Sequence, residues 1–112
     1  MKLIGSLIEG QFRNDLASSN AALQGQESER LRRALLSVGF PPERAYVLDW
    51  IPDQAEDIYR VLVSDDCVLT VELPRRGGNP LLRRQALRDY LRKCSKIQRI
   101  KVAVALDMLS SK

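Results

Sequence analysis

Six carboxylates between residues 49 and 66 stand close to two aromatic side chains. Carboxylates grouped on a surface can imitate phosphate groups and block a basic active site, and their charge raises the rate of association with such a site. The neighbouring aromatic residues favour this hypothesis, because aromatic anchors carry much of the binding energy at interfaces. Taken one at a time, each carboxylate is more typical of a solvated loop. As a group they predict a partner-binding surface made of Tyr46, Asp49, Trp50, Asp53, Glu56, Asp57, Asp65 and Asp66.

Basic residues dominate the other end of the chain. Residues 1–74 contain 7 Lys or Arg against 12 Asp or Glu, whereas residues 75–112 contain 11 against 2. Such groups bind phosphates and release counterions, so this charge indicates a nucleic-acid-binding module as the alternative function. A solvated helix face or a protein contact explains the same charges and is favoured, since Tyr90 is the one aromatic residue of segment 75–101 that could stack on bases. The residues of the alternative are Arg75, Arg76, Arg84, Arg88 and Arg92.

Asp53, Asp66 and Glu72 support a third hypothesis, a metal-dependent nuclease that holds its ion with carboxylates on a central hairpin. The position two residues after Glu72, where such a hairpin carries a lysine, is Pro74. The chain contains no histidine, which removes the commonest general base and the commonest transition-metal ligand. It also lacks a glycine-rich nucleotide-binding loop. We therefore expect a protein that is not an enzyme and has no catalytic residues, metal site or cofactor.

Length and hydropathy indicate one domain, residues 1–112, outside the membrane. No apolar run approaches the roughly 20 residues that a membrane span needs. Glu9, Gln11 and Arg13 interrupt the N-terminal apolar residues before a signal-peptide core could form, so we expect a cytoplasmic protein. Thiols stay reduced in the cytoplasm. Cys67 and Cys94 fall at positions whose pattern predicts burial, and they are expected to be free core thiols.

Residues 57–74 predict a β-hairpin, because β-branched and aromatic residues flank the turn-forming residues 64–66. A three-residue turn places Val63 opposite Cys67, and the facing pairs continue as Val61 with Leu69, Tyr59 with Val71, and Asp57 with Leu73. This register collects one apolar face from Tyr59, Val61, Val63, Cys67, Leu69 and Val71, and leaves Arg60, Thr70 and Glu72 on the other. A two-residue turn would mix polar and apolar residues on both faces, so the longer turn is predicted.

Three further elements are predicted before the hairpin. Apolar residues at four-residue spacing, Ile4, Ile8, Phe12 and Leu16, predict a helix from residue 3 to about residue 18, with a loop to residue 26. A second helix spans 27–38 and ends at Gly39, whose freedom to take a positive φ suits a Schellman-type stop. Residues 46–51 are aromatic, apolar and bounded by prolines, which predicts a strand.

The C-terminal third predicts a basic helix and one ambiguous segment. Asn79 and Pro80 are typical of a helix start, so we expect a helix over 79–94 in which Arg84, Arg88 and Arg92 form a continuous ridge. Residues 99–106 alternate with a period of two, which favours a strand and would complete a right-handed crossover. The spacing of Ile97, Ile100, Val104 and Met108 also satisfies a helix.

Together these elements predict an α+β fold with two N-terminal helices packed on a small, mostly antiparallel sheet of three or four strands, and with a C-terminal basic helix. By elimination, we expect a small cytoplasmic domain that binds another protein and no membrane. The expected function is that of an inhibitor of the immunity or antitoxin type, which blocks a toxic enzyme, such as a nuclease, through a charged surface. The preference for an inhibitor over other binding proteins is a general expectation for small proteins and does not come from particular residues.

Overall fold

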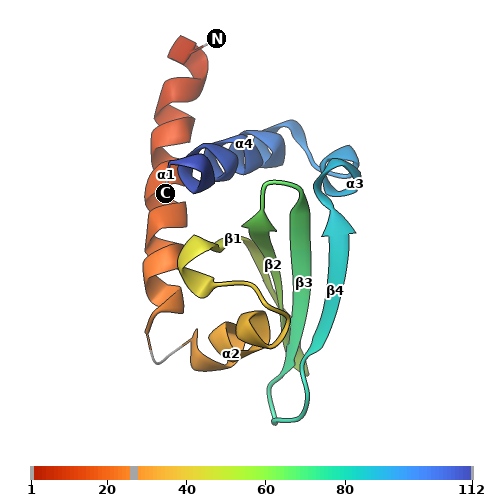
Figure 1. The fold of residues 1–112 in the computed structure, drawn as a ribbon. Helices are drawn as coiled ribbons and strands as arrows, with labels where there is room; N and C mark the ends of the chain where they lie inside the picture. Colours follow the sequence, from red (N-terminus) through yellow and green to blue (C-terminus); the bar gives the residue numbers. More distant parts are fainter. Residues whose placement is uncertain (1, 26–27, 112) are drawn as a thin grey trace.

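The computed structural model describes residues 2–25 and 28–111. These residues form an α+β fold in which four α-helices pack around a four-stranded antiparallel sheet, as shown in Figure 1. In chain order the elements are α1 (Lys2–Leu23), α2 (Glu29–Ser37), the 3-10 turn η2 (Pro42–Arg44), β1 (Tyr46–Pro52), β2 (Glu56–Ser64), β3 (Cys67–Pro74), β4 (Leu81–Ala86), α3 (Leu87–Arg92) and α4 (Lys96–Ser110). The predicted fold class is confirmed, as are the N-terminal helices and a helix at the C-terminus.

The sheet is a meander with the strand order β1-β2-β3-β4. The predicted hairpin is β2 and β3, and its pairs Asp57–Leu73, Tyr59–Val71 and Val61–Leu69 are confirmed. The predicted pair of Val63 with Cys67 is wrong, because Ser64 takes the place opposite Cys67 and Val63 is the extra residue of a bulge. The turn is therefore one residue shorter than predicted. The Ser64 hydroxyl closes it by donating to Asp66 Oδ1 over 2.8 Å.

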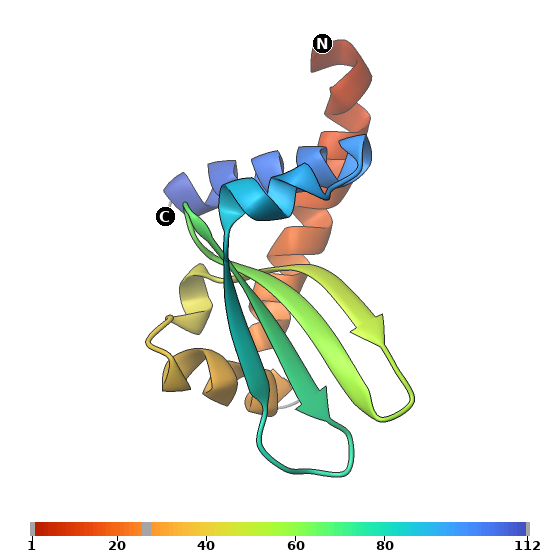
Figure 2. The same ribbon diagram turned by 90° about the vertical axis from the view of Figure 1, so that its right-hand side faces the viewer.

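Apolar side chains are buried on both faces of the sheet. The face that packs on α2, here called the α2 face, buries the predicted apolar set, namely Val61, Val63, Leu69 and Val71, with Tyr59 and Cys67 partly buried beside them. On the opposite face, called the α4 face, the described core residues lie near the β2–β3 turn, where Leu62 and Val68 join the core with α1, α3 and α4. Figure 2 shows α3 and α4 crossing that end of the sheet while the strands extend beyond them.

Helix α1 is longer than predicted. It runs to Leu23, whose side chain is buried, instead of ending near residue 18. The polar residues that indicated a loop hold the last turns of the helix against the following segment, because Asn20 Nδ2 donates to Ala45 O over 2.9 Å and Ser19 Oγ accepts from the Val47 N–H over 3.3 Å. The Ile4 side chain and Glu27, which belong to the two predicted N-terminal helices, lie outside the described residues.

Helix α2 ends as predicted. Gly39 has a φ of 86°, in the left-handed region that favours glycine. The Phe40 N–H donates to Leu35 O over 3.0 Å and the Gly39 N–H to Leu36 O over 3.1 Å, which is the hydrogen-bond pattern of a Schellman stop. The predicted strand over 46–51 is also confirmed, as β1.

The predicted helix over 79–94 is wrong in its first half. Residues Leu81–Ala86 form β4, which pairs along β3 from Glu72–Leu81 to Cys67–Ala86, and only Leu87–Arg92 are helical. The backbone hydrogen bonds that β3 offers at its free edge outweigh the local helix-start signal of Asn79 and Pro80. The predicted arginine ridge does not form, because Arg84 belongs to a strand and the other two arginines to α3.

The predicted strand over 99–106 is also wrong, since these residues belong to α4 and no right-handed crossover exists among the described elements. A capping box starts the helix: the Gln98 N–H donates to Ser95 Oγ over 3.2 Å, and the Ser95 N–H donates to Gln98 Oε1 over 2.8 Å. Val102 and Ala105 are buried on its inner side, so the helical alternative is the correct one. The two cysteines are free thiols, as predicted, but both are half-buried and not buried.

Candidate functional site

A bulge in β1 determines which side chains reach each face of the sheet. Val47 pairs with Val61, but the next pair is Asp49 with Arg60, so Leu48 is an extra residue. A bulge of this kind changes the side to which the following residues point. Asp49 therefore lies beside Arg60 on the α4 face, and Trp50 lies beside Tyr59 on the α2 face.

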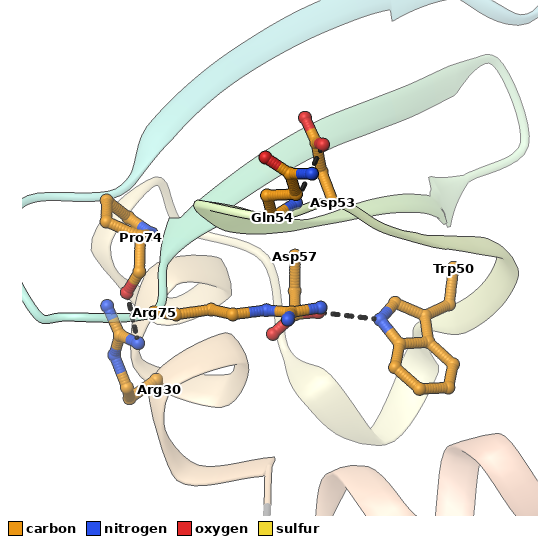
Figure 3. A network of polar contacts seen from close by, with 7 residues as sticks. All are labelled: Arg30, Trp50, Asp53, Gln54, Asp57, Pro74 and Arg75. Atoms are coloured by element: carbon orange, nitrogen blue, oxygen red, sulfur yellow. Dashed lines mark hydrogen bonds and ion pairs between the residues drawn. The ribbon is translucent and has the colours of Figure 1, made fainter.

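Trp50 is exposed, yet several contacts hold its indole ring. The ring stacks on Tyr59, with a centroid separation of 6.4 Å and an angle of 12° between the planes. Its Nε1 donates to Asp57 Oδ1 over 3.2 Å, and Arg75 Nη2 donates to the same oxygen over 3.0 Å (Figure 3). Arg30 adds a hydrogen bond of 2.7 Å to Pro74 O, next to Arg75. An aromatic ring that is 56% exposed is thereby kept in one orientation.

The Asp57 carboxylate is the centre of this network. The hydrogen bond from Arg75 lowers the pKa of Asp57 below its ordinary value, burial opposes this effect, and the Trp50 hydrogen bond adds to the lowering. Asp57 is thus ionised at neutral pH and can accept both hydrogen bonds at full strength. The pKa of Tyr59 is raised, chiefly because the ring is partly buried, so the residue under Trp50 stays neutral.

An apolar groove of about 230 Å³ lies beside Trp50, where α1 and α2 meet β1 and β2. We call it the Trp50 groove. Trp50 forms one wall, and the other lining residues are Ser19, Ala22, Leu23, Ser28, Leu31, Val47 and Tyr59. The groove can accept an apolar side chain from another molecule, while the Asp57–Arg75 ion pair supplies a polar edge.

The structure brings together only part of the predicted acidic and aromatic set. Trp50 and Asp57 are in contact, and Asp53 lies in the adjoining β1–β2 turn. Tyr46 is only 1% exposed and belongs to the core, so it is not available to a partner. Asp49 points to the α4 face. The predicted surface is therefore smaller than expected.

The remaining predicted carboxylates lie on β2 or beyond its end. Glu56, at the start of β2, has a raised pKa because of burial and its neighbour Glu72. Asp65 and Asp66 follow the other end of this nine-residue strand, roughly 26 Å away at about 3.3 Å per residue. Asp66 is thus remote from Asp53 and Glu72, the other two acids of the metal-nuclease hypothesis. The described residues contain no group of three or more His, Cys, Asp or Glu that could hold a metal ion.

The predicted basic residues do not form one surface either. Arg75 is paired with Asp57, and Arg76 is exposed in the β3–β4 loop. Arg84 lies over the Phe40 ring at 5.2 Å and donates to Val38 O over 3.3 Å on the α2 face. Arg88 and Arg92 belong to α3, where Arg92 pairs with Asp89 at 3.6 Å.

Three further site residues, Tyr59, Leu31 and Arg30, were not predicted from the sequence. Tyr59 was placed correctly on the apolar face, but its contact with Trp50 depends on the bulge at Leu48, for which the sequence carries no clear signal. Arg30 and Leu31 come from α2, whose position over the sheet follows from tertiary packing. No pattern within the helix itself could have revealed these contacts.

The described chain thus combines an antiparallel meander, helices on both of its faces, and one exposed tryptophan held in place. None of the described helices has both the length and the apolar character needed to cross a membrane. Comparison of the chain with protein-family models, with curated proteins and with solved structures finds no match.

Proposed function

We propose that the protein is a protein-binding module that contacts its partner through Trp50 and the Trp50 groove. The observation that carries this proposal is a tryptophan that is 56% exposed and nevertheless held by Tyr59 and Asp57. A large aromatic side chain whose orientation is already restricted loses little conformational entropy when a partner covers it. Such residues are enriched among those that dominate binding energy.

The chemistry of the surface suggests what the partner presents. The groove suits one bulky apolar side chain, because its volume is only about 230 Å³ and Leu23, Leu31 and Val47 are among its lining residues. Asp53, in the turn next to Trp50, makes no ion pair within the residues that the structure describes. A basic residue of the partner would complement this carboxylate and raise the association rate. A basic partner is also what an inhibitor of a toxic nuclease would bind, and this immunity or antitoxin role is the finer part of the proposal.

Trp50→Ala tests the binding surface, and Leu36→Ala is a matched control because Leu36 is 57% exposed but does not line the groove. Each variant is co-expressed with the proteins encoded by the genes on either side of the gene for this protein, and any complex is isolated. We expect Trp50→Ala to weaken binding by about 30-fold or more, as for a hot-spot residue that contributes about 2 kcal/mol. Leu36→Ala should leave binding unchanged. Equal binding by both variants would contradict the proposal.

The single tryptophan of the chain gives an independent measurement. If the partner covers Trp50, the emission of this residue shifts during a titration with a partner that lacks tryptophan. To test inhibition, the partner is expressed alone and together with the protein. A partner that is toxic alone and harmless together with the protein supports the inhibitor role. If the complex forms but the partner remains toxic, the protein is a binding module and the proposed inhibitor role is wrong.

A further inference from the structure

A second cavity lies on the α4 face, opposite to the Trp50 groove. It is a cleft of about 530 Å³ between the open half of the sheet and the segment where α3 passes into α4. We call it the Arg60–Arg83 cleft. Its walls are polar and include three cationic side chains against one carboxylate: Arg60, Arg83 and Lys93 against Asp49. Arg84 also borders the cleft, but its guanidinium group points to the α2 face.

The floor of the cleft is one row of side chains across the whole sheet. Asp49 pairs with Arg60, Arg60 with Thr70, and Thr70 with Arg83, so each strand contributes one polar residue to the same line. Side chains directly opposite each other in neighbouring strands lie about 5 Å apart. Two guanidinium groups therefore flank a hydroxyl on a rigid sheet. Lys93 and Gln98 approach this row from the helical side.

Many of these donors are not engaged within the protein. The Arg60 guanidinium approaches Asp49 at 3.6 Å, which is an ion pair without a short hydrogen bond. Arg83 uses Nη2 to contact Glu72 at 3.3 Å, and its other N–H groups remain available. Within the described parts of the chain, neither the Lys93 ammonium nor the Thr70 hydroxyl has a hydrogen-bond partner. The cleft thus presents convergent donors that match a ligand rich in acceptor oxygens.

We infer that the Arg60–Arg83 cleft binds the phosphoryl group of a small molecule. A phosphoryl group offers several acceptor oxygens that match guanidinium forks and an ammonium group. The volume of about 530 Å³ is within the range of small-ligand sites. Tyr90, in the wall, has a pKa raised to about 12 by burial and by its neighbours Cys94 and Asp49, so its phenol stays protonated beside a bound anion.

A small ligand fits the charges better than a nucleic-acid backbone does. Carboxylates limit the cationic row, since Asp49 lies at one end and Glu72 lies beside Arg83. A backbone needs a cationic path that continues across the surface, and each contact adds to the salt dependence of binding. The cleft is separate from the Trp50 groove, so the inference does not depend on the proposed protein-binding function.

The test uses pyrophosphate and the intact protein. Binding is measured by calorimetry, and the affected residues are located from amide NMR shifts. Lys93→Gln and Arg83→Gln remove charge from the cleft, whereas Arg76→Gln removes the same charge from an exposed residue of the β3–β4 loop that does not line the cleft. We expect shifts centred on Asp49, Arg60, Thr70 and Arg83, and a Kd raised by about tenfold in the first two variants. Arg76→Gln should bind as tightly as the unchanged protein.

Three results would overturn the inference. These are the absence of pyrophosphate binding at millimolar concentration, an equal loss in Arg83→Gln and Arg76→Gln, and binding of a short oligonucleotide that pyrophosphate does not displace. If Arg83→Gln fails to fold, Lys93→Gln tests the inference instead. Lys93 is exposed at the end of α3, and no carboxylate of the described residues pairs with it.

Discussion

Asp57 and Glu56 are neighbours in β2, point to opposite faces of the sheet, and differ in the direction of their pKa shifts. The arginine hydrogen bond lowers the pKa of Asp57, whereas burial and a second carboxylate raise the pKa of Glu56. The two residues therefore make opposite contributions to the pH dependence of folding. Each contribution can be separated by replacing the carboxyl with the amide of the same shape.

Asp57→Asn is expected to lower the free energy of unfolding by about 1 kcal/mol at pH 7, because it removes the charge that Arg75 and Trp50 bind. The folded-state pKa of Asp57 is lower than its ordinary value of 3.8. The stabilisation is therefore fully present above that value and is lost as the pH falls through the folded-state pKa. Urea denaturation of both proteins at pH 7 and at low pH checks this. A difference that stays constant with pH would contradict it.

Glu56→Gln should act in the opposite direction. Because the folded-state pKa of Glu56 is higher than its ordinary value of 4.5, ionisation of Glu56 costs stability as the pH rises through that interval. The variant is expected to be at least as stable as the unchanged protein at pH 7 and to have no advantage below the ordinary value. The same urea series measures this. A variant that is less stable at pH 7 would show that Glu56 makes a favourable contact as an anion.

Among the elements, α4 begins with a complete capping box, formed by Ser95 and Gln98. Ser95→Ala removes the hydroxyl that caps the Gln98 N–H, and we expect a loss of about 1 kcal/mol in the free energy of unfolding. Ser110→Ala is the matched control at the other end of the helix, where the hydroxyl donates to Asp107 O and the residue is exposed. The control should change stability by less than about 0.5 kcal/mol. Chemical denaturation gives both values, and equal losses would argue against the cap.

Elements with strong local patterns could be predicted from the sequence. Apolar and polar residues alternate along the hairpin, so one register places all the apolar residues on one face. Gly39 marks the end of α2. Strand β4 and helix α4 could not be predicted, because the Asn79–Pro80 start signal and the alternation over 99–106 are each satisfied by two structures. Tertiary contacts decide between them: β3 offers an edge to β4, and α1 packs on α4.

The same distinction applies to the candidate site. Trp50 and Asp57 were identified by residue type alone. Their contact with each other, and the removal of Tyr46 and Asp49 from that surface, depend on β1 register and on burial. Residue type thus indicated the kind of site, and the fold determines which of the candidate residues form it.

At the scale of the whole molecule, the sheet separates two apolar cores. Leu62 is buried on the α4 face and Leu69 on the α2 face. Replacing either with Ala should lower the free energy of unfolding by about 2–5 kcal/mol. If the chain is one domain, as its length predicts, Trp50 fluorescence and far-UV circular dichroism should give coincident unfolding transitions in both variants. Two separate transitions would show that the layers unfold independently.

The bulge at Leu48 determines the geometry of both proposed binding regions. If Leu48 were instead paired with Arg60, in a strand without the bulge, Asp49 and Trp50 would emerge on exchanged sides, even though the other three strands kept their pairing. Trp50 would then no longer stack on Tyr59, and the row of side chains beneath the Arg60–Arg83 cleft would lose the Asp49 carboxylate. A descendant of this gene that loses the Leu48 codon is therefore expected to keep Asp49 and Trp50 on their present sides, whereas one whose β1 pairs without a bulge at its present length loses both sites.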